Sequence, residues 1–148
     1  MEIKIVCEDE KYMPAYANET DACMDLKVRI PQGCYPYIEP KTSAIYGTGI
    51  KCSIPKDHVM LVFPRSSTGI KLHCMLSNTT GVIDSGYRDE IKMAITNFGD
   101  RTVELEDGQR IAQFMIIPRP KLELVTVADD EEFRNGDRGG GIGSSGKY

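Results

Sequence analysis

Short stretches in which apolar and polar residues alternate recur along almost the whole chain, and each one ends at a turn. A period of two residues is typical of β-strands that bury one face. Prolines, and turn dipeptides such as Asp107-Gly108, separate the stretches. The predicted strands are residues 2–7, 26–30, 43–46, 49–55, 58–63, 92–98, 103–105, 110–117 and 122–127, with at most an edge strand over 34–40 and an ambiguous stretch over 70–77. This spacing predicts an all-β barrel or a jelly-roll-like sandwich.

The C-terminal part of the chain differs in composition from the rest. Residues 129–148 are acidic and then rich in glycine, with few apolar side chains. Such a segment cannot bury enough apolar surface to fold by itself. We therefore expect one β-barrel domain over residues 1–128 and a flexible arm over residues 129–148.

The overall composition argues against several classes of function. With a net charge of −4, bulk electrostatics do not favour nucleic acid or an anionic membrane as a partner. No apolar run is long enough to span a bilayer, and the N-terminus alternates like a strand instead of resembling a signal peptide. The five cysteines are scattered and form no Cys-x-x-Cys pair, so we expect neither zinc nor disulfides, and a reducing cytoplasmic setting.

Residues 81–91 form a stretch in which Asp84 follows an apolar pair and precedes turn residues. Strand-like residues lie on both sides, and Gly81 and Gly86 tolerate a positive φ, so we expect a β-hairpin with Asp84 near its tip. Tyr87 would then lie close to the carboxylate. A carboxylate, a ring and free backbone amides in one turn suit a small planar ligand and an activated water. The alternative is an acidic surface hairpin.

Three further segments carry polar groups that a purely structural β-protein does not require. Arg65-Ser66-Ser67 follows a strand end and offers the donors that a polyphosphate needs, with a capped turn as the alternative. Gln113 interrupts an apolar strand, so it either bonds to backbone or points at a ligand. Asp25 lies at the mouth of a strand, where a carboxylate is either solvated or holds Mg²⁺ through water.

The glycine run at the end of the chain is the last candidate. Residues 138–146 combine Arg138 with serines and glycines. Glycine lets backbone amides approach an anion closely, so this arm is either a linker or a lid that closes over phosphates.

Together these segments resemble the trimeric dUTPase family, whose five ordered motifs all have counterparts here. The counterparts are residues 21–26, 64–71, 81–91, 108–113 and 138–146. The resemblance implies a jelly-roll-like β-barrel of the dUTPase-like (β-clip) type in a homotrimer. Each active site would draw on three subunits, and the arm would close over the site of a neighbouring subunit.

The resemblance also implies an activity. The expected reaction is Mg²⁺-dependent hydrolysis of dUTP to dUMP and pyrophosphate, which limits uracil incorporation into DNA and supplies dUMP for thymidylate synthesis. It implies no direct binding to nucleic acid and no membrane association. The protein would work in the cytoplasm, that of the host if it is viral.

A role for each site residue follows from the same resemblance. Asp84 would orient and deprotonate the water that attacks the α-phosphorus, and Tyr87 would pack on the deoxyribose and exclude a 2′-hydroxyl. Asp25 would anchor Mg²⁺ through its waters. The uracil edge would be read by Asn78, Gly81, Val82 and Ile83, and the phosphates would be held by Arg65, Ser66, Ser67, Gln113 and, from the arm, Arg138, Gly143 and Ser144.

Two other functions share this fold. A dCTP deaminase needs a glutamate placed to activate water at the cytosine ring, and the sequence offers no convincing candidate. A nucleotide-responsive regulatory binding protein could dispense with the catalytic groups, but Asp84, Tyr87, Arg65 and Arg138 are all present. The sequence therefore favours the dUTP-hydrolysing enzyme.

A few positions depart from the family pattern. Gly86 stands where the family usually has Asp, Asp89 where Gly is usual, and Cys23-Met24 where Gly followed by an aromatic residue is common. Ile142 occupies the arm position that usually carries Phe. None of these changes removes a residue assigned to catalysis.

We predict that Ile142→Phe tightens binding of dUTP and lowers KM, because isoleucine covers a base but has no ring to stack on it. Stacking of a base on an aromatic side chain contributes about 1–3 kcal/mol. Calorimetric titration of both proteins with a non-hydrolysable dUTP analogue measures the difference. An affinity that does not improve would remove the idea that Ile142 covers the base.

Overall fold

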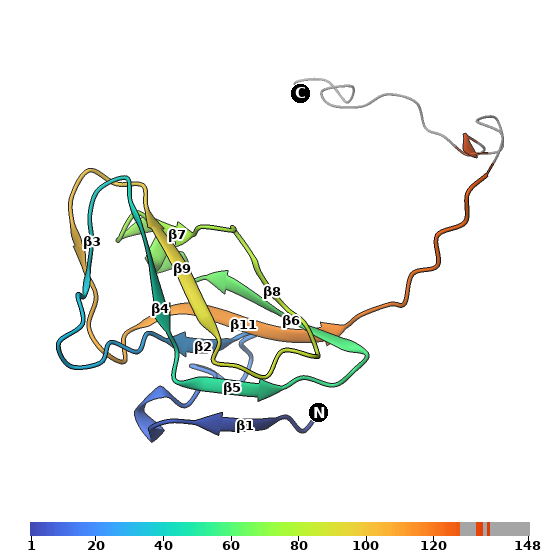
Figure 1. Cartoon of the computed structure of the whole chain (residues 1–148), viewed down its shortest axis with the longest axis horizontal. Helices are drawn as coiled ribbons and strands as arrows, with labels where there is room; N and C mark the ends of the chain where they lie inside the picture. The colour runs from blue at the N-terminus through green and yellow to red at the C-terminus, as the bar shows by residue number, and fades with distance from the viewer. Residues whose placement is uncertain (128–132, 135, 137–148) are drawn as a thin grey trace.

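The structure is a computed structural model that describes residues 1–127, 133–134 and 136. It is built mainly of antiparallel strands (Figure 1). The strands are β1 (Lys4–Cys7), β2 (Met24–Lys27), β3 (Tyr37–Ile38), β4 (Ser43–Gly47), β5 (Ile50–Ser53), β6 (His58–Pro64), β7 (Cys74–Leu76), β8 (Gly81–Ile83), β9 (Lys92–Asn97), β10 (Val103–Glu104) and β11 (Arg110–Pro118). The described chain also contains a 3-10 turn, η1 (Glu10–Tyr12), and a short helix, α1 (Ser66–Ile70). Among these residues, no helix is long and apolar enough to cross a membrane.

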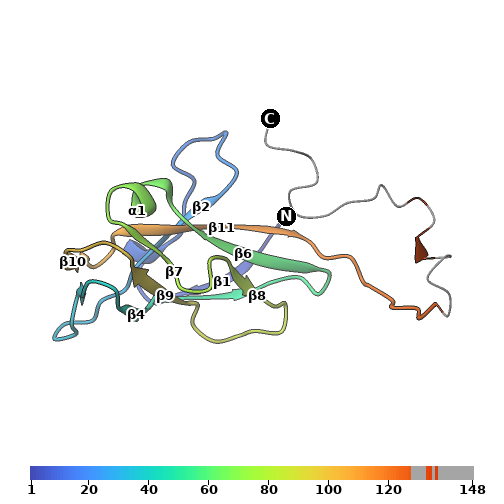
Figure 2. The same cartoon turned by 90° about the horizontal axis from the view of Figure 1, so that it is seen from above.

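The larger sheets form two layers around one core. One sheet has the strand order β2-β11-β6-β8 and the other has the order β4-β9-β7. Figure 2 shows β6 and β11 running through one layer while β4 and β9 lie in the other. The pairs β1-β5 and β10-β3 flank these sheets. The predicted all-β architecture is therefore confirmed.

Alternation along the strands places apolar side chains in the core, as the period of two predicts. On β9, Met93 and Ile95 are buried and pack with apolar residues of β2, β6 and β11 in a single cluster. Asn97 also points inward and is fully buried. Its amide donates to the carbonyls of Ile38 at 2.9 Å and Arg101 at 2.8 Å, so this buried polar group is satisfied.

The predicted hairpin over residues 81–91 is wrong. β8 pairs with β6, whereas β9 pairs with β4 and β7, so this stretch crosses from one sheet to the other. Neither Gly81 nor Gly86 has a positive φ. A Cβ atom on Gly81 would lie 3.1 Å from the Cβ atom of Val62, so glycine is needed there for close packing against β6. Alternation had identified the strands but not their partners.

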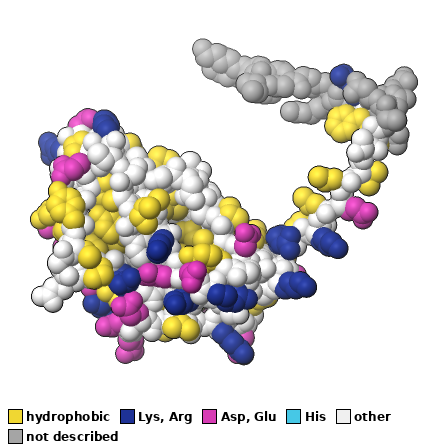
Figure 3. Space-filling model, in the orientation of Figure 1, with side chains coloured by type: hydrophobic (Ala, Val, Ile, Leu, Met, Phe, Trp, Pro, Cys, Tyr) yellow, Lys and Arg dark blue, Asp and Glu magenta, His cyan; other side chains and the backbone are white. Residues whose placement is uncertain are grey.

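One further expectation needs correction, and one alternative is removed. The serines after Arg65 begin helix α1, so the alternative of a capped turn does not describe them. Residues 122–127 form no strand, and Leu122, Leu124 and Val125 are 77%, 93% and 78% exposed. Figure 3 shows apolar side chains along this segment where it leaves the body after β11. The alternation is that of a strand, but in the described part of the chain this segment pairs with no other strand.

Candidate active site

A cavity of about 290 Å³ opens where helix α1 meets the start of β11. Arg65 takes the N-cap position of α1, immediately after β6 ends. Thr68 is buried and donates its hydroxyl to the carbonyl of Ile111 at 2.7 Å, which ties α1 to β11. The lining residues are Arg65, Ser67, Thr68, Lys71, Leu72, Gln109 and Arg110. Three cationic side chains and two hydroxyls therefore border a space suited to an anionic ligand, which we call the phosphate cavity.

Asp25 on β2 organises the arginines of the phosphate cavity. The residue is only 7% exposed, and its carboxylate forms an ion pair with Nε of Arg65 at 2.9 Å and accepts a hydrogen bond from Nη1 of Arg110 at 3.1 Å. Arg65 also donates from Nη1 to the carbonyl of Arg110 at 3.1 Å. A carboxylate between two guanidinium groups fixes both and leaves their remaining N–H groups for a ligand. The sequence did not predict this orienting role for Asp25.

The same carboxylate was assigned to Mg²⁺ through water. Each carboxylate oxygen has more than one lone pair, so an oxygen bound to an arginine still accepts from a water molecule. Across the described residues, no group of three or more His, Cys, Asp or Glu side chains lies close enough to hold a metal ion alone. This donor set fits an Mg²⁺ ion that arrives on nucleotide phosphates and keeps most of its waters.

Gln113 and Ser66 lie next to the phosphate cavity but are not among its lining residues. Gln113 is half-buried, and its amide nitrogen donates to the backbone carbonyl of Pro64 at 3.2 Å. Of the two alternatives that the sequence left open, bonding to backbone therefore holds for this nitrogen. Ser66 is exposed at the first position of α1. Both residues are thus beside Arg65, where the sequence placed them.

A second cavity, of about 260 Å³, lies between β8 and β9. It exists because these strands belong to different sheets and diverge. All the residues expected to read the base line it: Asn78, Gly81, Val82 and Ile83, together with Ile45, Val62, Leu76, Lys92, Met93 and Ala94. β8 is the edge strand of its sheet, so its outer amide and carbonyl groups are available to a ligand. The volume is smaller than the roughly 300–1,000 Å³ of pockets for drug-sized ligands, and we call it the base cavity.

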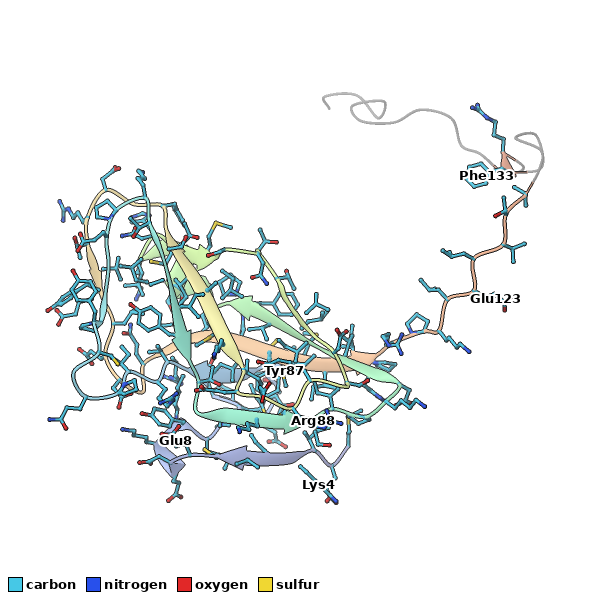
Figure 4. All side chains as sticks on the ribbon, viewed as in Figure 1. Lys4, Glu8, Tyr87, Arg88, Glu123 and Phe133 are labelled. Atoms are coloured by element: carbon cyan, nitrogen blue, oxygen red, sulfur yellow. The ribbon has the colours of Figure 1, made fainter. Side chains whose placement is uncertain are left out.

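Asp84 and Tyr87 follow directly after the base cavity, in the loop that joins β8 to β9. Asp84 is exposed, and its carbonyl accepts from the backbone N–H of Tyr87 at 3.0 Å. The Tyr87 hydroxyl donates to the carbonyl of Glu90 at 2.8 Å, and the residue is 37% exposed. Figure 4 shows Tyr87 in this loop above β5. The carboxylate and the ring therefore share one short turn, as predicted.

The register of the sheet keeps Asp84 far from the phosphate cavity of its own chain. Asp84 directly follows Ile83, which pairs with Met60 early in β6, whereas Asp25 is level with Phe63 near the end of β6. These carboxylates are four residues apart along the strands and three strands apart across the sheet. At about 3.3 Å per residue and about 4.8 Å per strand, their Cα atoms lie about 20 Å apart.

The predicted site residues thus fall into two groups on one chain. Arg65 and Ser67 line the phosphate cavity above Asp25, with Ser66 and Gln113 beside it, whereas the residues from Asn78 to Tyr87 surround or follow the base cavity. Arg138, Ile142, Gly143 and Ser144 lie outside the described residues. The sequence reasoning missed Lys71, Gln109 and Arg110, although each lies within a quoted motif; the basic residues Lys71 and Arg110 were the available signal.

Comparison with known proteins identifies the family of this chain. A family model described as dUTPase matches residues 9–146. The deoxyuridine 5′-triphosphate nucleotidohydrolase of Escherichia phage T5 is 38% identical over 148 residues, which cover 97% of this chain and 98% of the phage protein. The protein of the same name from Clostridium tetani is 36% identical over 147 residues, which cover 99% of this chain and 97% of the relative.

Solved structures show the same fold. A variant of the dUTPase from Staphylococcus bacteriophage 80alpha has a TM-score of 0.78 and 25% identity, over 95% of this chain and 97% of the phage chain. The dUTPase from Streptococcus mutans has a TM-score of 0.72 and 27% identity, over 83% of this chain and 99% of the other. The predicted resemblance and the dUTPase-like fold are therefore confirmed, and the chain belongs to the dUTPase family.

Proposed function

We propose that this chain hydrolyses dUTP to dUMP and pyrophosphate at sites that are assembled from neighbouring copies of the chain. The observation that carries the proposal is the separation of about 20 Å between Asp25, under the phosphate cavity, and Asp84, beside the base cavity. Reacting atoms must approach to about 3–3.5 Å, so one chain cannot use both groups on the same substrate. A second copy that brings its own phosphate cavity close to Asp84 resolves this.

The segment after β11 supports an assembly. Residues 122–127 carry the alternating pattern of a strand but are exposed and unpaired in the described chain. Pairing with an edge of a neighbouring copy would complete the strand and bury Leu122 and Leu124. The proposed assembly is a homotrimer, since a closed ring lets every copy give one surface and receive another. The arm, residues 129–148, would then close over a neighbouring site with Arg138, Ile142, Gly143 and Ser144.

The base half of the site accounts for the choice of uracil. The outer edge of β8 offers backbone donors and acceptors to a pyrimidine, as it would to another strand, and Asn78 lies on the same cavity. The amino group of cytosine would replace an acceptor with a donor and leave buried groups unpaired. The cavity walls also leave little room for a 5-methyl group. Tyr87 follows on the sugar side, where its ring would contact the position of a 2′-hydroxyl.

The chemical step uses Asp84 as a general base. The carboxylate is exposed, so it can accept a proton from a water held in line with the α-phosphorus. Arg65, Ser66, Ser67 and Gln113, with the newly found Lys71 and Arg110, would hold the phosphates and orient the pyrophosphate leaving group. Mg²⁺, when bound on the phosphates with Asp25 holding its waters, supplies charge neutralisation.

The activity is tested by measuring release of pyrophosphate from dUTP, dCTP, dTTP and UTP in parallel. We expect turnover of dUTP with the other three nucleotides used at least about 10²-fold less efficiently. A preference for dCTP with ammonia as a product would indicate a deaminase instead. Binding of nucleotides without turnover would indicate a regulatory protein.

Asp84→Asn should lower kcat by about 10²–10⁴-fold, because the amide cannot accept the proton from water. The Kd for a non-hydrolysable dUTP analogue should change little, since the amide has nearly the same shape. Steady-state kinetics and calorimetry measure the two effects. If turnover persists at the wild-type rate, Asp84 is not the base.

The shared site is tested by mixing two inactive variants, Asp84→Asn and Arg65→Gln, by co-expression. In a mixed trimer, an Arg65→Gln chain supplies an intact Asp84 to the intact phosphate cavity of an Asp84→Asn chain. Random assortment in a cyclic trimer should restore about a quarter of wild-type activity. The control mixes each variant with itself, and light scattering confirms the trimer. A mixture as inactive as the separate variants would refute a site built from different chains.

A further inference from the structure

The loop that carries Asp84 and Tyr87 has an anchor that none of the assigned roles uses. The Glu90 carboxylate accepts from Arg29 at both oxygens, from Nε at 2.9 Å and from Nη2 at 3.0 Å. It also accepts from the backbone N–H of Gly49 at 2.8 Å. Both charged side chains are mostly buried, 22% exposed for Arg29 and 19% for Glu90. A two-pronged, charge-assisted contact of this kind is strong and fixes orientation.

The backbone around Glu90 is shaped to receive its carboxylate. A Cβ atom on Gly47 would lie 2.2 Å from Oε1 of Glu90, so any side chain at position 47 would displace the carboxylate. Gly49 has a φ of +69°, a conformation that other residues rarely adopt, and this turn points its N–H at Glu90. Two glycines and one arginine, distant from Glu90 in sequence, therefore form its seat.

The loop end is also fixed through its backbone. The N–H of Ile91 donates to the carbonyl of Ile50 at 2.9 Å, and the hydroxyl of buried Thr48 donates to the carbonyl of Ile91 at 2.8 Å. Both backbone polar groups of Ile91 are therefore bonded to the segment 48–50, which joins β4 to β5. Arg29 lowers the pKa of Glu90 below its usual range, so the ion pair is intact at neutral pH.

Tyr87 is held by this same anchor. Its hydroxyl donates to the carbonyl of Glu90 at 2.8 Å, and its N–H donates to the carbonyl of Asp84 at 3.0 Å. These two hydrogen bonds therefore connect Tyr87 to Asp84 at one end of the loop and to the anchored Glu90 at the other. A displacement of the Glu90 backbone would therefore also displace the hydroxyl end of the Tyr87 ring.

We propose that Glu90, held by Arg29 and Gly49, is a positioning residue that sets the selectivity for deoxyribose over ribose by fixing the Tyr87 ring. The inference rests on the proposed function, in which the ring contacts the sugar. Excluding the 2′-hydroxyl of ribose requires that the Tyr87 ring stay in place, because a ring displaced by about 1 Å would admit the extra oxygen. The anchor supplies that rigidity from outside the substrate-contacting residues.

The test compares kcat/KM for dUTP with kcat/KM for UTP in Glu90→Gln and Arg29→Lys. Each variant weakens the two-pronged contact between Glu90 and Arg29 while keeping a polar side chain of similar length. We expect the ratio to fall by at least about tenfold, chiefly because UTP is used better, with kcat for dUTP changed less than about threefold. Asp89→Asn is the matched control, since it removes an exposed carboxylate from the adjacent position and should leave the ratio unchanged.

Tyr87→Phe is a second, independent arm of the test, because it removes only the hydroxyl that reaches Glu90 and leaves the Glu90–Arg29 pair in place. Its ratio should fall in the same direction, and it decides the matter if the other variants do not fold. Equal losses of dUTP and UTP turnover in folded variants, or an unchanged ratio, would overturn the inference. A wild-type enzyme without preference for dUTP would instead overturn the proposed function.

Discussion

β6 pairs with β11 on one edge and with β8 on the other, and this register determines where each half of the site lies. At the C-terminal end of β6, the chain passes into α1 and meets the start of β11, which creates the phosphate cavity. At the N-terminal end of β6, the paired strand β8 ends, and Asp84 follows it, exposed to solvent. Because strands are stiff and their spacing is fixed, these halves cannot approach each other within one chain.

Burial of Asp25 gives the phosphate half its rigidity. A carboxylate that is 7% exposed is costly unless it is paired, and here Arg65 and Arg110 pair with it. The group carries a net positive charge, so an anionic ligand completes its neutralisation. The glutamate anchor at the other half follows the same logic, with Glu90 paired to Arg29 beneath the loop. Each half is thus preorganised by a mostly buried acid that is held by arginine.

The sequence predicted the positions of individual strands and motifs well. It predicted poorly which strands pair and which distant residues contact each other. The strand periods of β6, β9 and β11 are visible because one face of each is buried. Arg65 was singled out because it belongs to one of the five motifs, and Asn78 because it lies just before another. The hairpin over residues 81–91 was wrong because β8 and β9 pair with strands far away in sequence. Residues 122–127 have the alternating pattern of a strand but pair with no strand in the described part of the chain. The seat of Glu90 was missed because Arg29, Gly47 and Gly49 come from distant segments.

The division of the site also explains how selectivity and chemistry are joined. The phosphate cavity, lined by three cationic side chains, would select its ligand by charge in the proposed function. The base cavity ends at Ile83 and the next residue is Asp84. In the proposed function, recognition of the base and placement of the water would therefore occur on adjacent residues of one strand end. On this proposal, the phosphate cavity could still hold the phosphates of a nucleotide whose base does not fit along β8. Its α-phosphorus would then be out of line with the water at Asp84, so discrimination would appear in kcat/KM and not merely in binding.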